Sequence, residues 1–270
     1  MNKSRRVLSL SILNLVGFLG IVVANALAIA LSLNSRTAGE LFDLYPNIFY
    51  PSLFTPAGLT AAFWRLIYIV FLAIFVVYPL IPSVRKDAQR VHFIQRIGLL
   101  FFISCLVNIG WTFAWHYEIV PLSLVLMLIL LGCLIAIYLR LNIGKSEATK
   151  AEKYAWHRAF SFYLGWITIA TIANVTALLV DINWNAWGLS EQFWAVAVSI
   201  VGIVIALSVL FTRKDTYYPF VVVWALLGRM AERTPVTTVP DHIVLVVAFV
   251  GVVLISGCVL AQLIRKQVVY

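Results

Sequence analysis

Charged side chains are scarce in this sequence. Only 11% of the 270 residues are Asp, Glu, Lys or Arg, whereas 63% are hydrophobic. A soluble globular domain has about 25% charged residues, because a polar surface must cover its core. The composition therefore excludes a single water-soluble domain and predicts an integral membrane protein.

Cysteine is also rare. The three cysteines, Cys105, Cys133 and Cys258, lie in different apolar runs and have no paired spacing. This distribution indicates neither a disulfide framework nor a zinc site. It favours cysteine as a small, buried apolar residue.

The sequence lacks the common catalytic and nucleotide-binding motifs, since it contains no phosphate-binding glycine loop, no HExxH and no GxSxG. No apolar run contains a lysine, which excludes a retinal protein, because that pigment forms a Schiff base with a lysine of the last helix. The four histidines are scattered. His116, beside Tyr117 and Glu118, is either an axial ligand or proton acceptor, or an interfacial loop histidine, and we favour the second interpretation.

Long apolar runs are what the sequence has in abundance. A membrane-spanning helix needs about 20 mostly apolar residues. Eight segments meet or approach that length: Val7–Leu33, Leu59–Leu80, Ile97–Trp115, Val120–Leu139, Phe160–Val180, Phe193–Phe211, the shorter Tyr217–Ala231, and Ile243–Ile264. The first run is too long for a signal peptide, so we interpret it as a retained helix.

The net charge of +9 comes from short basic clusters between these runs. With eight spans, 16 of the 20 basic residues fall on the side of the N-terminus, which predicts that both termini are cytoplasmic. With seven spans, Arg265 and Lys266 would lie on the wrong side, so eight is preferred. The clustering argues against nucleic acid as a partner and for the lipid bilayer, with the bacterial cytoplasmic membrane as the default location.

The connection Asn34–Gly58 is too apolar and aromatic for a solvated loop, and we expect it to fold over the outer end of the bundle. Three tryptophans and a tyrosine lie near predicted outer ends, where such rings form an interfacial belt. They are Tyr117, Trp184, Trp187 and Trp194.

Polar and aromatic residues recur at helical spacing within three runs, so each set shares one helix face. The sets are Trp166, Ala170 and Asn174; Asn108, Trp111 and Trp115; and Trp64 and Tyr68 with Arg65 beside them. Asn14 and Asn25 lie in the first run. Each asparagine either joins two helices by a hydrogen bond or lines an aromatic-walled pocket, and both interpretations stay open.

Arg65 lies in FTPAGLTAAFWRLIY, which begins at Phe54. An arginine in a membrane segment is a candidate functional residue. If Thr60 caps the helix, Arg65 lies within about 8 Å of its outer end, so its side chain can reach the headgroups. It can equally point inward, toward a loop carboxylate or the carboxylate of a ligand.

Three stretches resemble the tryptophan-rich sensory protein family, TspO, the bacterial relatives of the translocator protein. They are FTPAGLTAAFWRLIY, NIGW from Asn108, and YLGWITIATIAN from Tyr163. The third is the most specific, because its Tyr, Trp, Ala and Asn keep both identity and spacing. The resemblance covers about Val7 to Trp184 and implies a five-helix membrane bundle with a long first loop.

The resemblance also implies a pocket, closed by the first loop, that binds porphyrins or other haem-pathway tetrapyrroles, sterol-like lipids or other apolar ligands and requires no cofactor. By the family pattern, with Arg65 and Tyr68 added from their position, the predicted ligand-binding residues are Trp64, Arg65, Tyr68, Asn108, Trp111, Tyr163, Trp166, Ala170 and Asn174.

The chain departs from this pattern in several places. Paired prolines before the second helix are reduced to Pro56 and Ala57, and Arg65 stands where the family has an uncharged residue. Three more helices, from about Glu191 to Ile264, have no counterpart in five-helix members. We therefore predict an all-α membrane protein of eight helices, with a TspO-like domain at 1–184 and a three-helix extension at 185–270.

Three function classes follow. A membrane sensor or carrier of an apolar ligand is preferred, and a homodimer is one open arrangement for it. A secondary transporter has less support, because no inverted repeat relates the halves. A membrane enzyme acting on a pigment or lipid is also less favoured, because no acid, base or metal ligands are clustered in the sequence.

Overall fold

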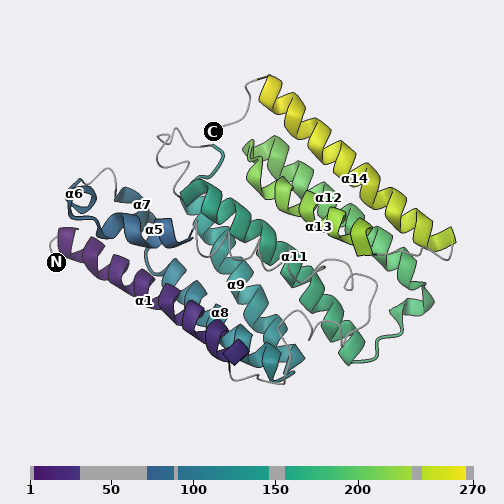
Figure 1. Ribbon diagram of the computed structural model, residues 1–270, viewed down its shortest axis with the longest axis horizontal. Coiled ribbons are helices and arrows are strands. Elements are labelled where there is room, and N and C mark those ends of the chain that lie inside the picture. The colour runs from purple at the N-terminus through teal and green to yellow at the C-terminus, as the bar shows by residue number, and fades with distance from the viewer. Residues whose placement is uncertain (1–2, 31–71, 88–90, 146–155, 233–238, 266–270) are drawn as a thin grey trace.

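The computed structural model describes residues 3–30, 72–87, 91–145, 156–232 and 239–265, and the regular secondary structure of these parts is entirely helical (Figure 1). The helices are α1 (Lys3–Ala30), α5 (Ala73–Val77), η3 (Tyr78–Leu80), α6 (Pro82–Arg85), α7 (His92–Ile97), α8 (Leu100–His116), α9 (Val120–Arg140), α11 (Arg158–Asp181), η5 (Ala186–Gly188), α12 (Glu191–Arg213), α13 (Tyr217–Glu232) and α14 (Val239–Ile264). The prediction of an all-α membrane protein is confirmed.

Five helices, α1, α9, α11, α12 and α14, are long and apolar enough to cross a membrane. Helices α8 and α13 are apolar but shorter. These seven correspond to seven of the eight predicted spans. Most of the predicted second span, Leu59–Leu80, lies outside the described residues, and its last part forms α5 and η3.

Local sequence signals explain where several helices begin and end. The Ser190 hydroxyl accepts a hydrogen bond from the Phe193 amide at 3.2 Å and caps the start of α12. The helix ends at Arg213, and Lys214 follows it in a left-handed conformation. The third span was predicted to begin at Ile97. Instead α7 ends there and Gly98, with φ +60°, breaks the helix before α8 begins.

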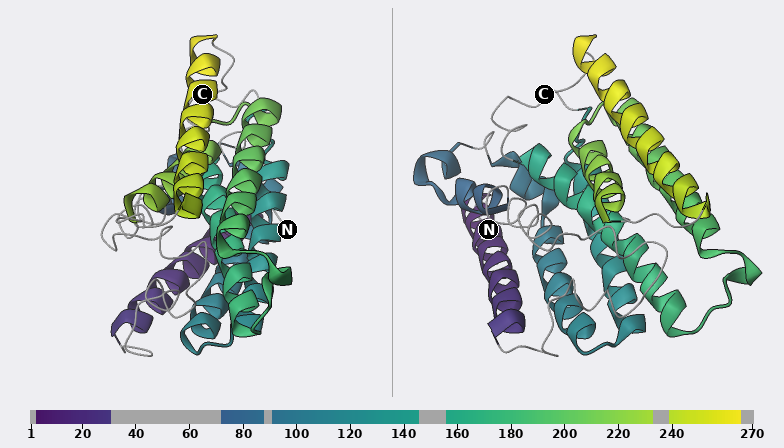
Figure 2. Two further views of the ribbon diagram at one scale, coloured as in Figure 1. Left: turned by 90° about the vertical axis from the view of Figure 1, so that its right-hand side faces the viewer. Right: turned by 45° about the vertical axis from the view of Figure 1, so that its right-hand side comes forward.

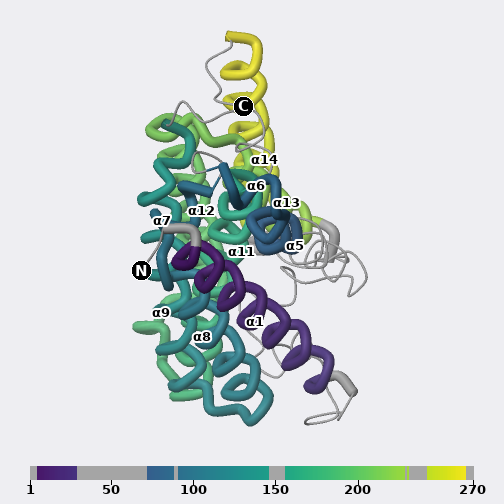
Figure 3. The backbone as a smooth tube through the Cα atoms, turned by 90° about the vertical axis from the view of Figure 1, so that its left-hand side faces the viewer, coloured from purple at the N-terminus to yellow at the C-terminus, as the bar shows by residue number. Residues whose placement is uncertain are grey.

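The long helices pack side by side in a simple order. Helix α1 packs on α8, α8 on α9, α9 on α11 and α11 on α13, while α12, α13 and α14 pack on one another. Helices α1 and α14 therefore lie at opposite edges of the molecule (Figures 1 and 2). Figure 3 shows α1 crossing in front of α8. The last three helices thus attach to the rest of the described chain mainly through α13 and α11.

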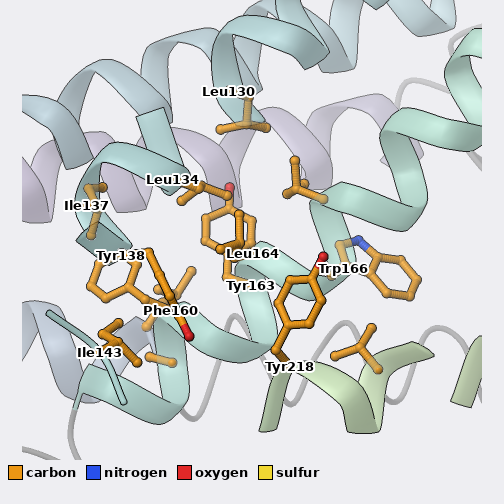
Figure 4. Packing of buried hydrophobic residues seen from close by; sticks show 14 of the residues in the cluster. Leu130, Leu134, Ile137, Tyr138, Ile143, Phe160, Tyr163, Leu164, Trp166 and Tyr218 are labelled. Atoms are coloured by element: carbon orange, nitrogen blue, oxygen red, sulfur yellow. The ribbon is translucent and has the colours of Figure 1, made fainter. Parts of the chain in front are cut away.

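Aromatic rings fill the core where α5, α7, α8 and α11 meet. Phe75 lies edge-on to Phe101 and to Phe160, with ring centroids 4.9 Å apart in each pair. Phe93 stacks on Trp156 at 3.8 Å. Leu130 and Leu134 of α9 continue this core along α11 (Figure 4). By contrast, many apolar side chains of α14 are exposed, as a lipid-facing helix requires.

The three tryptophans predicted near outer ends form one cluster between α11 and α12. The ring centroids of Trp184, Trp187 and Trp194 lie 5.1–5.5 Å apart in edge-to-face pairs. Trp187 is 73% exposed, and Tyr117, just after α8, is 61% exposed. Exposed rings that follow the ends of apolar helices suit the predicted interfacial belt.

Candidate functional site

One face of α11 carries four of the predicted site residues. Tyr163 and Asn174 are fully buried, and Trp166 and Ala170 are 7% and 6% exposed. Their spacing of three or four residues places them on successive turns of the helix. Figure 4 shows Tyr163 and Trp166 leaving neighbouring turns beside the core leucines of α9.

Tyr163 is bonded to the predicted site residue Asn108 on α8. The side-chain amide nitrogen of Asn108 donates to the Tyr163 hydroxyl at 3.2 Å. Asn108 is only 4% exposed, so the bond is made in a dry environment where an unpaired amide is costly. This bond fixes the position of α8 relative to α11 at that depth.

A second connection between α8 and α11 runs through Asn174. The indole nitrogen of Trp111 donates to the Asn174 side-chain oxygen at 3.4 Å. The Asn174 amide nitrogen donates to the Ser123 hydroxyl of α9 at 2.9 Å, and the same hydroxyl lies 3.3 Å from the Asn174 oxygen. Asn174 therefore joins three helices, as the helix-joining interpretation of its amide predicts.

Trp111 is held from a second side by an aromatic neighbour. Its ring is nearly parallel to that of Trp115, with an interplanar angle of 8° and centroids 6.1 Å apart. Trp115 is fully buried against Val120 and against Ala173 and Ala177 of α11, whereas Trp111 is partly exposed. Trp111 is therefore fixed by stacking and by a hydrogen bond, and part of its surface remains exposed.

The structure thus brings six predicted site residues onto two connected helices: Asn108, Trp111, Tyr163, Trp166, Ala170 and Asn174. The other three, Trp64, Arg65 and Tyr68, lie outside the described residues. The six supply indole and phenol rings, amides and a methyl group. Such groups offer stacking surface and hydrogen bonds, which are the means of recognising a bulky apolar ligand with a few polar atoms.

Ser123 contacts the candidate residue Asn174, and the sequence analysis did not single it out. It is fully buried on α9 and contacts both polar atoms of the Asn174 amide. A lone serine in an apolar run carries little signal, since its hydroxyl can bond the backbone of its own helix, as Ser123 also does with Val120 at 2.8 Å.

The preferred interpretation of His116 as an interfacial loop residue is wrong. His116 is the last residue of α8 and only 3% exposed, and its Nδ1 lies 2.7 Å from the backbone oxygen of Thr112. A carbonyl cannot donate, so this contact requires the proton on Nδ1. Because α8 extends to His116 and the side chain is buried, His116 belongs to the helix and not to the loop.

The asparagines of α1 behave differently from those of α8 and α11. Asn25 donates to the Ile21 backbone oxygen of its own helix at 2.9 Å. Asn14 is 1% exposed, and within the described chain neither of its amide atoms has a hydrogen-bond partner. Neither asparagine therefore joins α1 to another helix of the described chain.

The predictions about disulfides and metal sites can be compared with the residues that the structure describes. All three cysteines are free thiols, with Cys105 buried and Cys133 and Cys258 partly buried. Among the described residues, no group of three His, Cys, Asp or Glu side chains is placed to hold a metal ion.

Comparison with known proteins identifies the family. The model of the family described as TSPO-like protein matches residues 11–261, which includes α12, α13 and most of α14. The matched range is longer than the Val7 to Trp184 covered by the motifs, and the proposed division at residue 184 stays a prediction. Neither the curated proteins nor the solved structures gave a match. With nearly its whole length matched, the chain belongs to the TSPO-like protein family.

Proposed function

We propose that this TSPO-like membrane protein is a sensor or carrier that binds porphyrin-like, sterol-like or other apolar ligands against the joined faces of α8 and α11. The supporting observation is the state of Trp111. Its ring is oriented by Asn174 and by the parallel Trp115 ring, yet it remains partly exposed.

A fixed, partly exposed indole suits a planar or rigid apolar ligand. Indole provides a large stacking surface, and a ring that is already ordered loses little conformational entropy on binding. Trp166 is a second indole, on the same face of α11 as Asn174, and it is only 7% exposed. Ala170 lies between them along α11 and is itself buried.

Arg65 supplies the proposed charge selectivity. A guanidinium in a poorly hydrated setting binds a carboxylate strongly. Porphyrins carry propionate groups and sterols do not, so an Arg65 contact would favour the first class. Removing the arginine should weaken the binding of carboxylated ligands and leave that of uncharged sterols unchanged.

The test is a titration of the full-length protein in detergent with protoporphyrin and with a sterol, followed by tryptophan fluorescence. Trp111→Phe and Trp166→Phe should each raise Kd about five- to tenfold, the loss of about 1 kcal/mol of stacking. Trp187→Phe is the matched control, because its ring is 73% exposed and lies between α11 and α12. It should bind like the wild type.

Equal Kd values in the wild type and the three Trp variants, or quenching that never saturates, would contradict the proposal. The absorption spectrum of the bound ligand separates a sensor or carrier from an enzyme. A binding protein shifts and quenches the ligand's signal, whereas an enzyme converts it into a new absorbing species with time. Ligand uptake into protein-containing vesicles would identify the carrier.

A further inference from the structure

A buried carboxyl group lies where α9, α11 and α13 meet. Asp215, in the short connection between α12 and α13, is 4% exposed. Its Oδ2 accepts a hydrogen bond from the Tyr138 hydroxyl of α9 at 2.8 Å and one from the Ser161 hydroxyl of α11 at 2.6 Å. Both donors are themselves buried.

The other oxygen of the same carboxyl caps α13. The backbone amides of Tyr217 and Tyr218 donate to Oδ1 at 2.9 and 3.4 Å. Through one side chain, the first turn of α13 is therefore tied to Tyr138 of α9 and Ser161 of α11, which lie 77 and 54 residues from Asp215 in the sequence. None of the four donors carries a formal charge.

Two arginines near this carboxyl contact other groups. Arg158 of α11 donates through Nε to the Tyr217 hydroxyl at 2.6 Å. Arg213, at the end of α12, lies over the Tyr138 ring at 5.8 Å and reaches the Asn142 side-chain oxygen at 3.4 Å. Lys214 is exposed. His242 of α14 and Arg265, which directly follows this helix, are both exposed.

Close packing continues from this carboxyl along α11 and α13. The Tyr218 hydroxyl donates to the Thr168 hydroxyl at 3.0 Å. A Cβ added at Gly165 of α11 would come within 2.9 Å of a Val221 methyl group and 3.3 Å of the Tyr218 backbone oxygen. The backbone of α11 at Gly165 therefore packs directly against side chains of α13. A shift of the first turn of α13 would alter this contact.

Proton uptake preserves every contact of Asp215. When the carboxyl is neutral, Oδ1 still accepts both backbone amides. The proton on Oδ2 is donated to one hydroxyl, which turns, while the other hydroxyl still donates to Oδ2. When the carboxyl is ionised, the same contacts enclose a charge that has left water, and no cation among the described residues is paired with it, which is costly.

We propose that Asp215 is a proton-dependent latch, in which the protonated carboxyl holds α13, and with it α12 and α14, against α9 and α11, and ionisation loosens this attachment.

The direction of the effect follows from burial. Burial raises the pKa of Asp215, and the four donated hydrogen bonds oppose part of that rise. In the closed state, α13 is held against α9 and α11. Because the pKa of Asp215 is raised in this state, low pH favours it. That advantage is lost as pH rises above the ordinary value of about 4 and through the pKa of the closed state.

The first test compares the thermal midpoint of the full-length protein in detergent with that of Asp215→Asn, from about pH 5 to about pH 8. Asparagine has the shape of the neutral carboxyl, accepts both backbone amides and donates to both hydroxyls. The difference between the two midpoints should be smallest at the acidic end. At the alkaline end the wild type should fall about 3–5 °C below the variant. A constant difference across this range would overturn the proposal.

Asp181→Asn is the matched control, because Asp181 is exposed and lies at the other end of α11. Its curve should stay parallel to that of the wild type, and a curve that behaved like Asp215→Asn would contradict the assignment. Ser161→Ala provides a second test that retains the carboxyl. It removes a donor that favours the ionised form, so the pKa of the closed state should rise and the decline in stability should extend to a higher pH. A decline in stability that ends at the same pH in Ser161→Ala and in the wild type would also overturn the proposal.

Local opening is measured by hydrogen exchange in the wild type. Amides of the first turns of α13 should lose protection, relative to those of α9, as pH rises through the same range. The comparison with α9 corrects for the intrinsic dependence of exchange on pH. Equal changes in both helices would show that ionisation does not loosen α13.

Discussion

Trp111 and Asn174, 63 residues apart in the sequence, meet through a hydrogen bond of 3.4 Å from the indole nitrogen to the amide oxygen. Because Asn174 also contacts Ser123, this one amide holds α8, α9 and α11 together in the bundle interior. The residues proposed to contact a ligand are thus also residues that position the helices. Variants at this site must be tested for stability as well as for binding.

Replacing Asn174 with Ala should destabilise the protein by about 1–2 kcal/mol, because the Ser123 and Trp111 side chains each lose a partner inside the bundle. The thermal midpoint in detergent measures this loss. Asn25→Ala is the matched control, since Asn25 bonds only the backbone of its own helix in the described structure. Equal effects of the two substitutions would show that Asn174 does not join the helices.

Removing the Tyr163 hydroxyl should lower the free energy of unfolding by about 1 kcal/mol, because the Asn108 amide then loses an acceptor in a buried site. Tyr163→Phe and Asn108→Ala should be coupled in a double-mutant cycle, with the double variant less destabilised than the sum of the singles. Thermal or denaturant unfolding of the four proteins supplies the comparison. Additive effects would mean that the 3.2 Å bond does not contribute to stability.

A methyl group at Gly165 should disturb the contact between α11 and α13. Gly165→Ala places a carbon 2.9 Å from a Val221 methyl group and close to the Tyr218 backbone, and it should cost about 1–3 kcal/mol through overpacking. Gly132→Ala is the control, because this exposed helical glycine of α9 has no atom within 4 Å of an added Cβ. It should leave stability unchanged or raise it by up to about 1 kcal/mol.

Alanine substitutions at two glycines with positive φ distinguish the cost of backbone strain from the cost of a steric clash. Gly144 has φ +81°, and an added Cβ would overlap the Arg213 backbone carbonyl, whereas Gly98 has φ +60° and open space around that position. Gly98→Ala should therefore lower the free energy of unfolding only by the backbone strain, about 1–3 kcal/mol. Gly144→Ala should lower the thermal midpoint further, since the α9–α11 connection must move away from the end of α12. Equal midpoints would contradict this packing.

Most helices could be predicted from the sequence because membrane insertion demands long apolar runs. The predicted span from Val120 begins where α9 begins and ends one residue before it, and Ile243–Ile264 falls within α14. The start of the third span was misplaced because Ile97 is apolar on either side of a helix break. The break depends on the positive φ of Gly98, which an average of hydropathy does not detect.

Helical spacing and family resemblance place the six described candidate residues on common helix faces, whereas the hydrogen bonds among them and to Ser123 could not be predicted. Spacing identifies residues on one face of a helix but not the helix opposite. Ser123 and Ser161 are single hydroxyls in apolar surroundings, and each becomes important only through a group from a distant part of the chain. His116 was misjudged because its burial depends on how neighbouring helices cover the end of α8.

The sequence by itself determined that this protein is a helical membrane protein with TspO-like motifs, because hydrophobicity, helical spacing and the positions of basic residues are local properties of the chain. The tertiary structure decided which polar groups meet. It paired Trp111 with Asn174, and it placed Asp215 among two hydroxyls and two amides from three helices. The physical reason is that a buried hydrogen bond depends on two groups at one point in space, and their separation along the chain does not reveal this.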